Sequence, residues 1–150
     1  MKAVTYHFSI PRYLLAYLLG KRFPWFYYGP WSAVSLTDYP EPQLRGPDWV
    51  RLRPRLAGIC GTDLGTITAK NSPLLTPLAS FPAVLGHEVV AEVTAVGPAV
   101  QRVEVGQRVV VDPVLHCGVR GLTPCAACRR GDTGACENFA EGQLAPGAFL

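Results

Sequence analysis

Apolar and polar positions alternate with a period of two along several stretches of this chain, which is the pattern of half-buried β-strands. Residues 2–6 predict a first strand. Residues 50–56 alternate valine and leucine with arginine, and Pro54 places this strand at a sheet edge or at a bulge. Further strands are expected at 89–96 and 109–111. Successive short strands separated by turns predict a mainly β domain, a compact and partly open barrel with short helices.

The N-terminal region departs from this strand pattern. Pro11 and Gly20 bracket a predicted helix at residues 12–19, whose apolar residues surround the whole helix axis. Such a helix is expected to be buried or docked. An aromatic-rich stretch follows: Phe23, Trp25, Phe26, Tyr27, Tyr28 and Trp31. It either forms a buried cluster under a long loop or an exposed surface, as a lid over a substrate cleft or an oligomer contact.

Composition narrows the class of protein. A chain of 150 residues is one domain by length, and its 14 prolines and 15 glycines favour a β-rich fold over a helical bundle. The net charge of +3 is too small to indicate a nucleic-acid or anionic-membrane partner. Residues 14–19 are too short to span a bilayer and lack a cleavage site, so we expect a cytoplasmic protein with no membrane partner.

Two short segments carry the residue types of an open zinc site. Residues 58–63 read Gly-Ile-Cys-Gly-Thr-Asp and residues 85–88 read Leu-Gly-His-Glu, with a proline-rich loop at 71–82 between them. Alone, Cys60 would be interpreted as a small buried hydrophobe and His87 as a core histidine. Together they offer a thiolate and an imidazole for a zinc ion whose remaining position is left to water or substrate.

The residues around these two ligands suggest supporting roles. Asp63 is suited to accept the other imidazole N–H of His87, which would fix the tautomer of the ring. Thr62 is a plausible cap for a short helix over residues 64–69.

A second possible metal site lies later in the chain. Its four cysteines are Cys117, Cys125, Cys128 and Cys136. The second and third cysteines have C-x2-C spacing, which lets two thiolates on a tight turn bind one tetrahedral metal ion. Either the loop 118–124 bulges outward and Cys117 closes a four-cysteine site, or another group such as His116 completes the coordination. A third reading is reduced cysteines without metal.

These motifs together resemble the zinc-dependent alcohol dehydrogenases of the medium-chain dehydrogenase/reductase superfamily. Residues 58–63 match the family's GICG(T/S)D signature, residues 86–88 match GHE, and residues 106–111 look like its GDRV strand. The resemblance runs from about residue 32 to 139. It implies a GroES-like catalytic domain, with residues 117–136 as a structural zinc lobe. The family places two residues between the first two cysteines of that lobe, whereas this chain has seven.

The resemblance also implies the chemistry. A catalytic zinc held by Cys60 and His87, with Glu88 at or near the metal, would polarise an alcohol or carbonyl oxygen for hydride transfer to NAD or NADP. Thr62 would hydrogen-bond that oxygen and begin a proton relay, and Asp63 belongs to the same catalytic group. The family's frequent relay histidine is absent, and Gly65 occupies that region.

The expected domain organisation follows. Residues 1–31 form a strand, a helix and an aromatic insertion, starting at residue 7, that belong to the same domain as the catalytic part at 32–150. No G-x-G-x-x-G motif occurs, so the Rossmann cofactor domain and the remaining zinc ligand are expected beyond Leu150. We expect a truncated chain that binds zinc but is inactive alone, and a homo-oligomer at full length. The alternative is a non-catalytic zinc-binding module or an inactive fragment.

Overall fold

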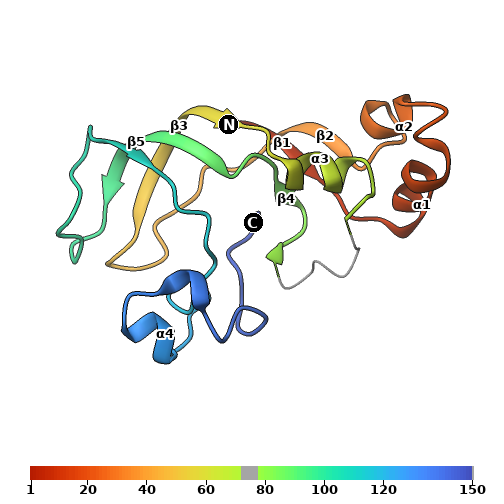
Figure 1. Ribbon diagram of the computed structural model, residues 1–150. Coiled ribbons are helices and arrows are strands. Elements are labelled where there is room, and N and C mark those ends of the chain that lie inside the picture. The colour runs from red at the N-terminus through yellow and green to blue at the C-terminus, as the bar shows by residue number, and fades with distance from the viewer. Residues whose placement is uncertain (72–77, 150) are drawn as a thin grey trace.

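The computed structural model describes residues 1–71 and 78–149, and part of the predicted 71–82 loop therefore lies outside the described residues. Figure 1 shows an open arrangement of short strands with small helices at its margins. The elements, in chain order, are β1 (Lys2–Tyr6), α1 (Ile10–Leu19), α2 (Trp25–Tyr28), β2 (Val34–Asp38), β3 (Val50–Gly58), α3 (Gly61–Ile67), β4 (Ala83–Val84), β5 (Glu88–Val96), β6 (Arg108–Val110), α4 (Ala126–Arg129) and the 3-10 turn η2 (Thr133–Ala135).

The strands form two antiparallel three-stranded sheets, in the orders β2-β1-β4 and β3-β5-β6. Neither sheet closes on itself, and this confirms the mainly β, partly open architecture. The predicted strands at 2–6 and 89–96 are confirmed within one residue, and the last strand begins at Arg108 rather than Val109.

The arginine-rich strand β3 confirms the prediction made from its proline. It lies at the edge of its sheet, and its register with β5 shifts between Pro54 and Leu56. A bulge of this kind reverses the side to which the following residues point. Leu56 is accordingly 73% exposed, although the alternation predicts an inward position.

The buried apolar side chains on the strands are mostly small. Ala83 and Ala91 are fully buried, and Val93 is 1% exposed. Tyr6 packs its ring against Phe81, with ring centroids 6.0 Å apart, and its burial raises the pKa of the phenol above 10.0.

Helix α1 is present, and of its two expected outcomes it is docked rather than buried. Ala16 is its buried residue, while Tyr17 and Leu18 are 61% and 69% exposed. The helix docks through small residues: a Cβ at Gly20 would lie 2.2 Å from the Tyr27 ring. The contact is made by the face of the helix that carries small residues, so its large apolar side chains remain exposed to solvent.

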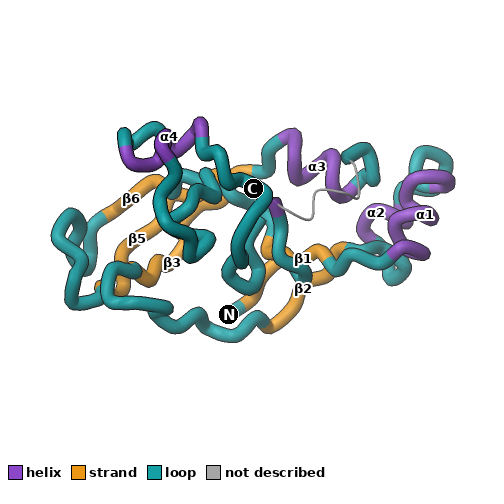
Figure 2. Tube along the Cα trace, turned by 90° about the horizontal axis from the view of Figure 1, so that it is seen from below, coloured by secondary structure: helices purple, strands orange, loops and turns teal. Residues whose placement is uncertain are grey.

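The aromatic stretch is likewise exposed, so of its two interpretations the exposed surface holds and the buried cluster does not. Trp25, Tyr28 and Trp31 are 44%, 74% and 59% exposed. In Figures 1 and 2, α1 and α2 stand together at one end of the molecule, far from the lobe that carries α4. Within the described residues, no helix is long and apolar enough to cross a bilayer.

Candidate metal centres

The first candidate centre is built on the N-terminus of α3. The Cys60 Sγ accepts a hydrogen bond from the Thr62 backbone N–H at 3.1 Å, and the Cys60 N–H donates to Asp63 Oδ2 at 2.9 Å. The helix therefore starts at Gly61, with Cys60 and not Thr62 as its cap. The cysteine sulfur takes the place of the usual capping hydroxyl because it also accepts a backbone N–H. The capping geometry fixes where the sulfur points.

His87 approaches this sulfur from the start of β5. Its Nε2 lies 3.2 Å from Cys60 Sγ, and its Nδ1 is buried with no hydrogen-bond partner among residues 1–71 and 78–149. The predicted hydrogen bond from Nδ1 to Asp63 is not formed, because Oδ1 is 3.8 Å away. That oxygen accepts the Gly86 backbone N–H at 3.1 Å instead. Asp63, 1% exposed, thus ties together the two backbone segments that present the thiol and the imidazole.

The donor set fits a zinc ion. Ligand atoms of Cys60, Asp63 and His87 all lie within 4.8 Å of one another. Zn–S of about 2.3 Å and Zn–N of about 2.05 Å in a tetrahedral arrangement place sulfur and nitrogen about 3.6 Å apart. The observed 3.2 Å needs a few tenths of an ångström of adjustment.

Two predicted site residues take other positions. Glu88 is exposed and lies opposite Gly58, where its Oε2 would be 2.7 Å from an added Cβ. Within the described residues, Glu88 does not join the group of three ligand atoms. Thr62 is exposed and contacts its neighbours through its backbone: its N–H donates to Cys60 Sγ and its carbonyl accepts from Asn71.

Asn71 is a positioning residue that the sequence reasoning missed. Its Nδ2 donates to the Thr62 carbonyl at 3.0 Å and to Thr66 Oγ1 at 3.1 Å. A Cβ at Gly65 would lie 2.3 Å from Asn71 Oδ1, so the amide fills the space of a side chain at position 65. Tyr13 of α1 donates its hydroxyl to the Asn71 carbonyl at 3.1 Å. A glycine within a short helix was the available signal for this close approach.

A pocket of about 350 Å³ lies beside His87, and its wall is mostly apolar. The Phe149 ring packs tilted against the imidazole, with the ring centroids 5.6 Å apart and the ring planes at 55°. Trp49, Val84 and Leu115 contribute to the same wall. These residues come from four distant segments, so the sequence offered no signal for them.

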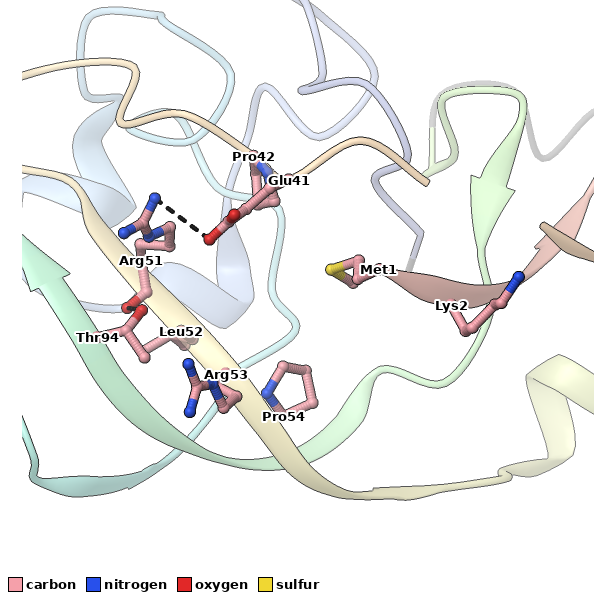
Figure 3. A pocket seen from close by; sticks show the side chains of 9 residues that line it. All are labelled: Met1, Lys2, Glu41, Pro42, Arg51, Leu52, Arg53, Pro54 and Thr94. Atoms are coloured by element: carbon pink, nitrogen blue, oxygen red, sulfur yellow. Dashed lines mark hydrogen bonds and ion pairs between the residues drawn. The ribbon is translucent and has the colours of Figure 1, made fainter. Parts of the chain in front are cut away.

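A larger pocket, about 520 Å³, lies between β1 and β3 (Figure 3). None of the residues that line it belongs to either candidate metal centre. It is bordered by Lys2, Arg51 and Arg53. Arg51 turns toward Glu41, with Nη1 to Oε1 at 3.4 Å. Arg53 is exposed on this border, whereas Arg51 is partly covered.

The second candidate centre gathers the late cysteines. Their four Sγ atoms all lie within 4.8 Å of one another: Cys117, Cys125, Cys128 and Cys136. The first and last sulfurs are 3.6 Å apart, close to the roughly 3.8 Å expected between thiolates on one tetrahedral zinc. His116 stays outside the group, and its Nδ1 accepts the Gly118 N–H at 3.1 Å.

Arg120 holds the extra loop in place, and sequence reasoning missed it too. This arginine is 3% exposed. Its Nε donates to the Leu115 carbonyl at 2.6 Å and its Nη1 to the Glu141 carbonyl at 3.2 Å. The loop 118–124 is thereby folded back on its two flanks. The fully buried Cys117 then reaches the other three sulfurs despite the longer spacing.

Backbone groups also prepare this second cluster for a cation. N–H groups of Cys128 and Glu137 lower the pKa of the Cys125 thiol to about 6. At Cys128, the N–H of Cys117 favours the thiolate, but burial and the neighbouring sulfurs outweigh it and raise the pKa to about 12. Metal ligation requires deprotonated thiols, so a bound divalent ion would favour loss of the thiol protons in this cluster.

Comparison with known proteins places the chain in a family. Residues 46–149 match the alcohol dehydrogenase GroES-like domain. The chain is 40% identical over 101 residues to the starvation-sensing protein RspB of Escherichia coli, covering 67% of this chain and 27% of that protein. It is also 40% identical over 102 residues to L-threonine 3-dehydrogenase of Pyrococcus furiosus, covering 68% and 26%.

Solved structures give the same result. Alcohol dehydrogenase TADH from Thermus sp. ATN1 superposes with a TM-score of 0.61 at 28% identity, over 97% of this chain and 35% of that one. An NAD-dependent alcohol dehydrogenase superposes with a TM-score of 0.63 at 26% identity, over 99% and 34%. The chain thus spans about a quarter to a third of the length of these relatives. It belongs to the alcohol dehydrogenase GroES-like domain family, within the zinc-dependent alcohol dehydrogenases of the medium-chain dehydrogenase/reductase superfamily.

Proposed function

We propose that this chain is the catalytic-domain portion of a zinc-dependent alcohol dehydrogenase that acts on a small-molecule alcohol or carbonyl substrate with NAD or NADP. The observation that carries the proposal is the convergence of Cys60 Sγ and His87 Nε2 at 3.2 Å beside an apolar pocket. The nicotinamide would be bound by a cofactor domain that is not in this chain. The catalytic unit would be residues 32–150, with residues 1–31 packed onto it as part of the same domain.

The residues of the first centre would have different roles in catalysis. A zinc ion bound there would supply Lewis-acid polarisation of the substrate oxygen. Cys60 and His87 would hold the ion, and Asp63 would keep their backbone segments together through its bonds to the Cys60 and Gly86 N–H groups. The wall that includes Phe149 would exclude water from the substrate's apolar part.

The proton route is proposed to start at the exposed hydroxyl of Thr62. No side chain stands at Gly65, and the Asn71 amide occupies that space. An amide does not titrate near neutral pH, so it cannot replace a histidine as an acid or base. We therefore propose that the proton passes from Thr62 to solvent directly. Glu88, exposed and outside the ligand group, would act on the site through its charge.

The second centre would hold a structural zinc through Cys117, Cys125, Cys128 and Cys136. All-thiolate sites of this kind are closed to substrate and stabilise the fold. We extend the proposal to a cytoplasmic enzyme that is a homo-oligomer at full length.

Metal analysis of the purified 150-residue chain tests the proposal. We expect two zinc ions per chain, falling to one in Cys60→Ser and to one in Cys125→Ser. His116→Gln is the matched control and keeps two, because its ring lies outside the cluster. A Cys60→Ser chain that still binds two ions would refute the catalytic centre. A wild-type chain with one ion, retained in Cys60→Ser, would identify a non-catalytic zinc module.

Activity provides a second test. The isolated chain is expected to show negligible oxidation of alcohols with NAD or NADP, since it has no dinucleotide motif. A normal turnover rate from the isolated chain would contradict the proposed division into two domains.

A further inference from the structure

The N-terminal hairpin, defined as residues 7–31 with helices α1 and α2, exposes large apolar side chains that neither metal centre uses. Their exposed fractions run from 38% to 74%: Ile10, Leu14, Tyr17, Leu18, Leu19, Phe23, Trp25, Tyr28 and Trp31. A clustered apolar surface of this kind on a small domain marks a site of interaction. Scattered single residues would need no such explanation.

The charge on the hairpin is of one sign. No aspartate or glutamate occurs from residue 3 to residue 37, whereas Arg12, Lys21 and Arg22 are all exposed. Within residues 1–71 and 78–149, none of these three cations forms an ion pair. The Arg22 guanidinium lies over the Phe23 ring, 5.1 Å from its centroid. The overall charge of +3 conceals this segregation, because the acidic residues all come later in the chain.

A second copy of the chain fits this surface poorly. A two-fold contact would place the same patch on both sides of the interface. Arg12, Lys21 and Arg22 of one copy would then face the same cations of the other, with no carboxylate in either hairpin. The surface calls for a partner that is both apolar and negatively charged.

We propose that the hairpin docks on an anionic lipid surface, with α1 and α2 lying in the plane of the headgroups. Tryptophan and tyrosine favour the boundary between acyl chains and headgroups, and exposed lysine and arginine are attracted to anionic lipids. The ten residues of α1 are too few to span a bilayer, which is consistent with a helix that lies on the surface.

The position of the hairpin leaves the metal centres accessible. Figures 1 and 2 show α1 and α2 at one end of the molecule, with the α4 lobe at the opposite side. The Tyr13 hydroxyl connects the hairpin to the carbonyls of Ala69 and Asn71, just beyond α3. A lipid-bound hairpin would therefore hold the first centre near the membrane without covering the cysteine lobe.

Vesicle flotation of the full 150-residue chain tests the proposal. We expect binding to vesicles of 70:30 phosphatidylcholine and phosphatidylglycerol, weak binding to pure phosphatidylcholine, and release by 0.5 M salt. Lys21→Gln and Arg22→Gln should each weaken binding about fivefold, and Leu18→Ser should weaken it further. Arg53→Gln and Leu36→Ser are the controls, since both residues are exposed outside the hairpin and should leave binding unchanged.

Three results would overturn the proposal. One is no binding to anionic vesicles; another is equal binding to both kinds of vesicle. The third is a concentration-dependent dimer, seen by sedimentation, that Leu18→Ser or Lys21→Gln dissociates. The zinc content of each variant is measured in parallel, so that failure of the lipid-binding proposal can be distinguished from failure of the metal-binding proposal.

Discussion

Asp63 is the carboxylate whose removal is predicted to cost most, although it is neither the best zinc ligand nor a partner of the imidazole N–H. It is 1% exposed and accepts two backbone N–H groups, from Cys60 at 2.9 Å and Gly86 at 3.1 Å. One of these starts α3 and the other precedes His87. The perturbation we consider is Asp63→Asn, which keeps the size of the side chain and removes one acceptor and the charge.

The expected loss follows from these two hydrogen bonds. A hydrogen bond to a charged group contributes about 1.5–3 kcal/mol, and a buried N–H left without an acceptor costs about 1–3 kcal/mol. The asparagine retains one carbonyl for one N–H and presents an NH2 group to the other. We therefore expect Asp63→Asn to lower the free energy of unfolding by about 3 kcal/mol. Asp63→Ala, which abandons both N–H groups, should lower it by about 4–5 kcal/mol.

Urea unfolding of the metal-free chain, followed by tryptophan fluorescence, measures this loss without a contribution from zinc. Asp38→Asn is the matched control, because its carboxylate pairs with Lys2 at 2.6 Å while both side chains are more than 60% exposed. An exposed pair contributes about 0–1 kcal/mol. If Asp63→Asn costs no more than Asp38→Asn, the assignment of Asp63 as the residue that joins the two segments is wrong.

Two further predictions concern the sheets. A Cβ at Gly97 would lie 2.2 Å from the Pro47 carbonyl oxygen, so Gly97→Ala should lose about 3 kcal/mol of stability by urea unfolding. Gly61→Ala, where an added Cβ meets nothing within 4 Å, should be neutral or slightly stabilising; equal losses would contradict the clash. The hydrogen bond from Arg55 lowers the pKa of Glu92 below 4.5. The stabilisation from this pair is therefore present above pH 4.5 and lost as the pH falls through the lower folded pKa. Arg55→Gln should flatten that acid-side decline in Tm between pH 3 and 5, and an unchanged profile would show that the pair is not responsible.

Local signals were enough for most strands and for the identity of the two motifs. Alternation and turn residues act over a few positions, so β1, β3 and β5 were predictable before any contact was known. The burial of α1 was not, because it depends on Gly20 and Tyr27 meeting at the contact with α2. The pattern of apolar residues says which side chains would favour burial and does not say whether a partner is present.

The candidate sites divide in the same way. Cys60 and His87 stand in short motifs, and the structure brings their ligand atoms together. Whether Cys117 joins the other cysteines could not be decided from spacing, since the path of the loop depends on Arg120 reaching carbonyls five residues back and twenty-one residues ahead. The role of Asp63 was misjudged because sequence proximity to the motif suggested the imidazole, whereas the nearest N–H groups belong to the backbone.

The contact between Asn71 and Gly65 restricts the order in which substitutions at these two positions could be accepted. A histidine at position 65 would collide with the Asn71 amide, where an added Cβ already lies 2.3 Å from Oδ1. Loss of Asn71 first would remove donors from the Thr62 carbonyl and the Thr66 hydroxyl, near the start and the end of α3. Each single change is therefore disfavoured while the double change is open, and the two positions are epistatic. A lineage that has settled on this pair would keep its glycine, and an engineer who wants a titrating side chain there should change both positions at once.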